Sequence, residues 1–314
     1  MKLRVLGCSG GIGGELRTTA LLIDDDVLID AGTGIGELSL DEMKKIRHIF
    51  LTHTHLDHIA CLPLMVDSMF PYLVEPMMVR SHAAALEVLK KHIFNWSVWP
   101  DFTAIPNADA PFMRYQRIKL GQRVILDGRV FTPLPANHTV PAVGYQIDSG
   151  AGSLVYTGDT YVNDPLWKLV NRIPNLRYLL IETAFCNREK QLAVASKHLC
   201  PSLLAEELSK LERSAEIFIT HLKPGQIDMA AVRLVEQVAL PHQRVAMRID
   251  DEQRLVQGLR PRADRLAGWH QPVHRFFRQL WREQEKRSGC QNQQQRKATQ
   301  KTTHYPLRFS VTKS

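Results

Sequence analysis

The feature that most constrains the fold of this 314-residue chain is a histidine-rich segment, HTHLDH at residues 53–58. It directly follows an apolar stretch, His48–Thr52, which predicts a buried strand. Three imidazoles and a carboxylate this close together are typical of a metal site, because zinc and similar ions prefer these ligands. His53 and His55 can point the same way from an extended turn, and Asp57 and His58 then lie across the bend, placed for a second ion. The alternative interpretation is a polar loop in solvent.

Other potential ligands follow other apolar strands. They lie in the segments Asn137–Thr139, Thr157–Thr160 and Thr220–Leu222, which contain His138, Asp159 and His221. A lone His or Asp at such a position is more often a hydrogen-bonded structural group. Loops at one end of a sheet in an α/β fold converge on one site, however, so we expect these groups to meet.

The order of the predicted elements indicates an α/β fold with layered sheets and helices outside, because strands dominate the first half and strands alternate with helices in the second. The expected strands are 3–7, 18–23, 27–29, 48–52, 77–80, 123–126, 130–133, 142–147, 153–157, 178–182 and 216–220. The expected helices are 40–46, 83–92, 165–172, 201–211 and 229–238.

The positive charge of the chain is concentrated near its end. Residues 251–314 hold 14 Lys/Arg and 5 Asp/Glu, whereas the first 250 residues hold 26 basic and 27 acidic groups. We therefore expect a catalytic domain over 1–250 and a basic C-terminal tail over 251–314. Within the tail, the residue pattern predicts a basic amphipathic helix over 266–286, and the polar composition predicts disorder over 288–314.

Cysteine usage and hydropathy indicate the compartment. The five cysteines form no C-x-x-C pair, so neither a disulfide framework nor a thiolate zinc site is expected. No apolar run is long enough for a transmembrane segment, and the N-terminus has no signal-peptide pattern. These observations favour the cytoplasm.

The full ligand pattern resembles the metallo-β-lactamase superfamily, whose order is H-x-H-x-D-H, then His, Asp and His. The resemblance covers roughly residues 1–240 and implies an αβ/βα four-layer sandwich with two divalent metal ions at one edge. It implies His53, His55 and His138 on one ion, Asp57, His58 and His221 on the other, and Asp159 bridging both. Zinc fits this ligand set, and manganese and iron are not excluded.

Further segments are similar to class II 3′,5′-cyclic-nucleotide phosphodiesterases. The segment 94–100, FNWSVWP, resembles the FN-x-x-x-WP block of that family, and 181–185, 198–201 and 220–224 resemble its downstream blocks. Cys200 stands where the family usually has Thr. The resemblance implies an enzyme that hydrolyses cyclic AMP or cyclic GMP to the 5′-monophosphate.

The chemistry expected of such a site is attack by a hydroxide shared between ions about 3.5–4 Å apart. Asp57 and His198 are the predicted catalytic residues, with His198 as the acid that protonates the leaving oxygen near the start of a helix at Pro201. An ordinary surface histidine at a helix cap is the alternative for His198. Glu182 is expected either to orient a ligand imidazole or to be a solvated strand-end carboxylate.

Aromatic and glycine-rich segments are ambiguous. Phe94, Trp96 and Trp99 would stack on a purine, line the wall of the pocket or pack in the core. The loop Gly10–Gly14 is not a dinucleotide-binding turn, because a strand rather than a helix follows it, and flexibility near the site is the simpler interpretation.

Two alternative functions remain open. One is a tRNA 3′-processing endonuclease of the ribonuclease Z type, since a polyanionic substrate would suit the basic tail. The near-neutral body argues against it, so we expect a small-molecule substrate and no stable nucleic-acid partner. The other is a non-catalytic scaffold that kept the fold. The sequence does not determine the oligomeric state, and a dimer is compatible with it.

Overall fold

The computed structural model describes residues 1–225 and 244–247. All of these belong to the first of two compact units, Met1–Leu259, and the second unit, Arg260–Ser314, lies outside the described residues. The helices expected over 229–238 and 266–286 and the polar segment 288–314 also lie outside them.

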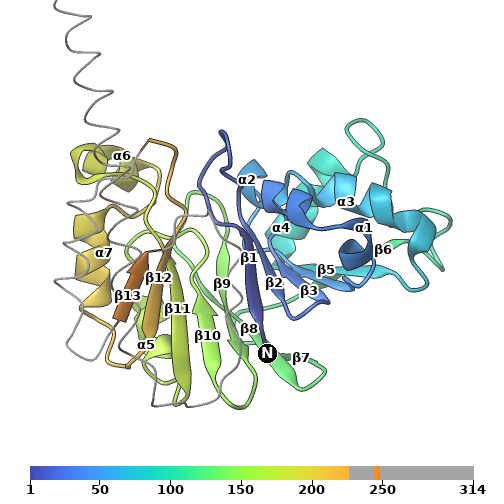
Figure 1. Cartoon of the computed structure of the whole chain (residues 1–314). Coiled ribbons are helices and arrows are strands. Elements are labelled where there is room, and N and C mark those ends of the chain that lie inside the picture. The colour runs from blue at the N-terminus through green and yellow to red at the C-terminus, as the bar shows by residue number, and fades with distance from the viewer. Residues whose placement is uncertain (226–243, 248–314) are drawn as a thin grey trace, which may run out of the picture. The chain divides into compact units, whose positions relative to one another are not determined.

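Two sheets form the centre of the first unit, and in each sheet the strands are neighbours in chain order (Figure 1). The six strands of the first sheet are β1 (Leu3–Gly7), β2 (Ala20–Ile23), β3 (Val27–Ile29), β4 (His48–Phe50), β5 (Met77–Ser81) and β6 (Met113–Arg117). The seven strands of the second sheet are β7 (Val124–Leu126), β8 (Arg129–Pro135), β9 (Val143–Asp148), β10 (Ser153–Tyr156), β11 (Leu176–Glu182), β12 (Glu216–Thr220) and β13 (Arg244–Met247).

Each sheet is antiparallel on one side and parallel on the other. Strands β1 to β3 pair antiparallel, and β3 to β6 pair parallel. Strands β7 to β10 pair antiparallel, and β10 to β13 pair parallel. Because parallel strands end at the same edge of a sheet, the segments that follow β10, β11 and β12 emerge side by side.

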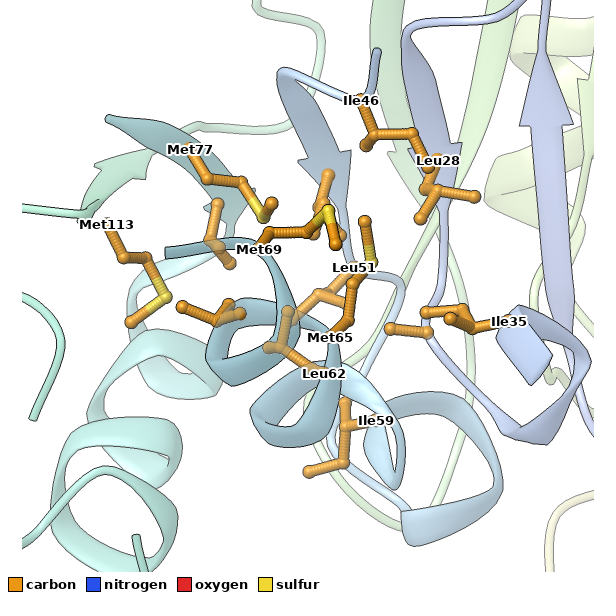
Figure 2. Packing of buried hydrophobic residues seen from close by; sticks show 14 of the residues in the cluster. Leu28, Ile35, Ile46, Leu51, Ile59, Leu62, Met65, Met69, Met77 and Met113 are labelled. Carbon is orange, nitrogen blue, oxygen red and sulfur yellow. The ribbon is translucent and has the colours of Figure 1, made fainter. Parts of the chain in front are cut away.

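Helices cover the outer face of each sheet (Figure 1). On the first sheet they are α1 (Leu40–Met43), α2 (Leu56–Ile59), α3 (Leu62–Met69) and α4 (Ala83–Val88), and on the second α5 (Asp164–Val170), α6 (Lys190–Ala195) and α7 (Pro201–Leu208). Figure 2 shows Met65 and Met69 of α3 pointing toward Leu51 and the strands that carry Leu28 and Met77. None of the helices in the described part of the chain has the length and hydropathy that a bilayer span requires.

Aromatic side chains fill the space between the two sheets. Phe50 of β4 and Phe131 of β8 are fully buried and stack with ring centroids 4.7 Å apart. Tyr145 of β9 packs edge-on against Phe50 and donates a hydrogen bond to the carbonyl of Leu51 at 2.8 Å. The layers therefore run helix, sheet, sheet, helix, which confirms the predicted α/β four-layer sandwich.

The predicted elements are largely present, with shifted ends. The hairpin at Asp24–Asp26 is confirmed, and Asp24 has the positive φ of 50° that tight hairpin turns require. The helix expected over 83–92 ends at Val88 and continues as a π-helical turn over Leu89–Ile93. The sequence did not predict α2, α3, α6, β6 or β13, because these short elements show no clear hydrophobic period of their own and depend on tertiary packing.

The packing between the sheets leads to a stability prediction. Replacing Phe131 with Ala removes a ring that is fully buried, and we expect the free energy of unfolding to fall by about 3–5 kcal/mol. Ile125→Ala, on β7 at 65% exposure, is the control and should change it by less than about 1 kcal/mol. Urea denaturation followed by circular dichroism measures both, and equal values for the two variants would contradict this account of the core.

Candidate metal centre

The histidine-rich segment leaves β4 through Thr52 and turns into α2. Thr52 is fixed between the sheets, because its carbonyl accepts a hydrogen bond from Val143 N at 3.0 Å. His53 is fully buried, His55 is the residue that precedes α2, and His58 is buried within that short helix. The turn therefore presents the imidazoles inward at the edge where the two sheets meet.

The structure brings all of the predicted ligand residues together in two clusters that share one carboxylate. In each cluster, atoms able to bind a metal ion lie within 4.8 Å of one another. The first cluster is His53, His55, His138 and Asp159, and the second is Asp57, His58, Asp159 and His221.

Asp159 is the most constrained member of both clusters. Its side chain is 1% exposed, and neither carboxylate oxygen has a hydrogen-bond partner among the residues that the structure describes. His221 Nε2 and His58 Nε2 approach Asp159 Oδ2 at 3.2 Å and 3.3 Å, and within the described part of the chain these two nitrogens also lack hydrogen-bond partners. Buried polar atoms without partners are costly, so their convergence fits a bound cation. The donor set, imidazole and carboxylate, is the one that zinc and similar ions take.

The electrostatics favour neutral imidazoles at most positions. Burial lowers the pKa of His138 to about 4 and that of His221 to about 3, and it holds the pKa of His53 well below its usual range. Neutral imidazole is the form that donates a lone pair to a metal. Burial raises the pKa of Asp159, but the interactions of the carboxylate with the imidazoles of His221 and His58 outweigh burial, and the net shift is strongly downward.

His58 lies between two buried carboxylates. Burial lowers its pKa, but Asp159 and Asp30 outweigh burial and raise the pKa well above its usual value. Positive charge is therefore favoured at this point, and a proton and a metal ion would compete for the same imidazole.

An acceptor holds the far side of the His53 and His138 rings, whereas His221 Nδ1 has no hydrogen-bond partner among the described residues. His53 Nδ1 lies 3.0 Å from Thr52 Oγ1, and His138 Nδ1 lies 3.1 Å from the carbonyl of Lys197. A proton on Nδ1 leaves the lone pair of Nε2 free for a ligand. His55 is turned the other way, with Nδ1 3.2 Å from His53 Nε2 and 3.1 Å from His138 Nε2.

Asp30 orients the second cluster, although the sequence patterns did not predict a role for this residue. This fully buried carboxylate accepts hydrogen bonds from Thr52 N at 2.7 Å and Thr52 Oγ1 at 2.8 Å, and it lies 2.7 Å from His58 Nδ1. Its φ of 60° is unusual for a residue other than glycine. The signal that was available is its position directly after the buried strand β3.

His198 and Glu182 form a buried pair beside the clusters. Glu182 Oε1 lies 2.8 Å from His198 Nδ1, so Glu182 orients His198 rather than one of the predicted ligands. The His198 ring centroid lies 4.8 Å from that of His138 and 5.1 Å from that of His221. Burial raises the pKa of Glu182 to about 7, and the carboxylate in turn raises the pKa of His198 against the effect of burial. Both the surface interpretation of His198 and the solvated interpretation of Glu182 are therefore wrong.

Gly10 of the glycine-rich loop packs closely against His221, so flexibility is not the role of this residue. A Cβ on Gly10 would lie 2.7 Å from the carbonyl oxygen of His221 and 3.0 Å from its ring. The loop pairs closely with the segment after β12, since His221 N donates to the carbonyl of Cys8 at 2.6 Å and Gly10 N to that of Leu222 at 3.0 Å. His221 itself has a φ of 62°. Close backbone approach, for which only glycine has room, therefore holds this imidazole in place.

The aromatic segment divides between core and surface. Phe94 is 1% exposed and packs in the core of the first sheet, together with the partly buried Trp99. Stacking on a substrate is therefore not the role of Phe94. Trp96 is 64% exposed and has a φ of 66°.

Comparison with known families gives a match over most of the described chain. The model of the beta-lactamase superfamily domain matches residues 26–241. The chain belongs to the beta-lactamase superfamily. This membership confirms the resemblance seen in the sequence, and together with the His/Asp clusters it supports a metal-dependent hydrolase.

Two curated relatives carry phosphodiesterase names. A 3′,5′-cyclic-nucleotide phosphodiesterase of Aliivibrio fischeri is 27% identical over 279 residues, covering 69% of this chain and 80% of the relative. A probable 3′,5′-cyclic-nucleotide phosphodiesterase of Yersinia pestis is 27% identical over 206 residues, covering 58% of each chain.

Solved structures share the fold at low identity. Unliganded yeast PDE1 superposes with a TM-score of 0.66 at 19% identity, covering 79% of this chain and 97% of that one. The short form of human tRNase Z gives a TM-score of 0.57 at 17% identity, covering 82% of this chain and 99% of that one. At these identities the likeness shows the metallo-β-lactamase fold and does not distinguish between the activities.

The contacts of Asp30 lead to a prediction about metal affinity. In Asp30→Asn the amide places a donor where the carboxylate accepted, so His58 loses the acceptor that fixes its ring. We expect affinity for Zn²⁺ to fall about 10–100-fold while the fold is retained. Titration of the apo-protein against a chromophoric chelator measures the affinity. Asp67→Asn, on the exposed side of α3, is the matched control, and an Asp30→Asn affinity equal to that of the control would contradict the role of Asp30.

Proposed function

We propose that this protein is a metal-dependent phosphodiesterase that hydrolyses 3′,5′-cyclic nucleotides, cyclic AMP or cyclic GMP, to 5′-monophosphates. The observation that carries the proposal is the pair of His/Asp clusters joined by Asp159, which is buried and accepts no hydrogen bond from the described residues. The names of the two curated relatives support the choice of substrate.

Two divalent ions, zinc by preference, complete the proposed site. His53, His55 and His138 would hold one ion, Asp57, His58 and His221 the other, and Asp159 would contribute to both. When bound, such ions supply Lewis acidity toward the phosphodiester and make a water molecule acidic near neutral pH. Asp57, the predicted catalytic carboxylate, would then be a ligand of the second ion. Its side chain is 22% exposed, whereas that of Asp159 is 1% exposed.

His198 is the proposed general acid. Glu182 holds its Nδ1, which leaves Nε2 as the nitrogen that exchanges a proton with substrate. The ring lies against His138 and His221, one from each cluster, so a leaving 3′ oxygen beside the ions would also lie near His198. The buried carboxylate of Glu182 stabilises the protonated imidazole before the proton is transferred.

A tRNA 3′-processing endonuclease of the ribonuclease Z type is the second candidate. The observation in its favour is the excess of basic residues in 251–314, which would suit a polyanion. The near-neutral composition of residues 1–250 favours a small substrate instead. We propose 1–250 as the catalytic domain and 251–314 as an accessory tail, and we propose that the protein acts in the cytoplasm without a stable nucleic-acid partner.

A substrate panel on one zinc-loaded preparation tests the proposed function. The panel contains cyclic AMP, cyclic GMP, a linear phosphodiester and a precursor tRNA, all at the same ionic strength. We expect turnover of a cyclic nucleotide to a 5′-monophosphate, identified by chromatography. Cleavage of precursor tRNA with no turnover of cyclic nucleotides would replace the first candidate with the second.

The position of His198 leads to a separate prediction. His198→Ala should lower kcat about 10²–10⁴-fold, because a positioned acid contributes this much to proton transfer. Bound metal, measured on the same sample by mass spectrometry, should not change, since His198 belongs to neither cluster. His92→Ala removes an exposed histidine and is the matched control. Loss of metal from His198→Ala would show that His198 is a ligand and not the acid.

A further inference from the structure

Lys197 has a backbone conformation that a lysine adopts at a cost. It follows helix α6 with a φ of 53°, in the left-handed region. Two hydrogen bonds close the helix around it, from Lys197 N to the carbonyl of Val194 at 3.2 Å and from His198 N to that of Ala193 at 2.8 Å. Glycine is the usual residue at this point of a helix end, because it alone takes this conformation without strain.

Both ends of Lys197 contact the same residue, His138. The carbonyl of Lys197 accepts from His138 Nδ1 at 3.1 Å, and the ammonium Nζ of Lys197 donates to the carbonyl of His138 at 3.1 Å. These two hydrogen bonds together fix the backbone of His138 and the tautomer of its ring. Glycine at this position would keep the first contact and lose the second.

Lys197 also determines where the next residue lies. Its left-handed turn directs the chain from α6 to His198, whose ring lies 4.8 Å from that of His138. One residue therefore links a member of the first His/Asp cluster to the histidine beside it, across the 59 residues that separate Lys197 from His138.

We propose that Lys197 is a positioning residue for the metal centre, and that its ammonium holds His138 in the place from which Nε2 binds the ion of the first cluster. The inference rests on the metal site of the proposed function. Strained residues persist where the surrounding contacts compensate for them, and here the compensating contact is the bond from Nζ to the carbonyl of His138.

Two substitutions separate this role from that of an ordinary helix end. Lys197→Gly relieves the backbone strain and removes the ammonium, whereas Lys197→Met keeps the strain and the aliphatic stem and removes only the ammonium. A matched control is Asp127→Gly, another residue at positive φ, 47°, which lies at the opposite end of β8 from His138.

The measurement is a Zn²⁺ titration of the full-length apo-protein against a chromophoric chelator, with the melting temperature of the apo-protein beside it. We expect both Lys197 variants to bind one equivalent of Zn²⁺ roughly tenfold more weakly than the wild type, the lower end of the effect of losing a residue that orients a ligand. Lys197→Gly should melt no lower than the wild type, and Asp127→Gly should keep wild-type affinity. Saturating Zn²⁺ should restore turnover in both Lys197 variants.

The outcomes are distinguishable from those of the substrate test. Wild-type affinity in Lys197→Gly would overturn the inference, because the residue would then be only a helix terminus. Weaker Zn²⁺ binding in Lys197→Met but not in Lys197→Gly would also overturn the inference. Both variants lack the ammonium, so the backbone strain that only Lys197→Met keeps would then be the cause. A wild type that binds Zn²⁺ but hydrolyses no cyclic nucleotide would overturn the proposed substrate and leave the role of Lys197 standing.

Discussion

The structure around the site depends on one electrostatic constraint, the burial of the Asp159 carboxylate without a hydrogen-bond donor from residues 1–225 or 244–247. An isolated buried charge is too costly to persist, so it must be compensated by positive charge nearby. The groups that face Asp159 are imidazoles whose burial favours their neutral form, with His58 as the exception. A metal cation held jointly by the carboxylate and the imidazoles would satisfy this constraint.

The fold brings the residues around Asp159 together at the ends of strands, and several of these residues have a strained backbone conformation. Asp30, Lys197 and His221 all have φ near 60°, and each lies in or against one of the two clusters. Left-handed backbone at residues other than glycine persists where surrounding contacts over-determine it, and such residues concentrate at functional sites. The stacked rings between the sheets supply the rigid base on which these turns are held.

The sequence predicted the layered fold and singled out the residues that the structure gathers into two clusters, because apolar strands and the polar groups that follow them are local patterns. It did not predict Asp30 or Lys197, because their importance lies in contacts with His58 and His138 that are distant in the chain. Phe94 and Gly10 were ambiguous for the same reason. Tertiary packing determines that the Phe94 ring is buried and that Gly10 lies against the His221 imidazole, which is far from Gly10 in the sequence.

The most direct test of the account is the metal content of zinc-reconstituted wild type and Asp159→Asn, measured by mass spectrometry on gel-filtered protein. The amide in this variant would keep the shape of the side chain and remove the charge that both clusters share. The account predicts roughly two equivalents of Zn²⁺ in the wild type, as in other two-metal sites, and a loss of most bound metal from the variant. A wild type that retains no metal, or a variant that retains as much as the wild type, would contradict it.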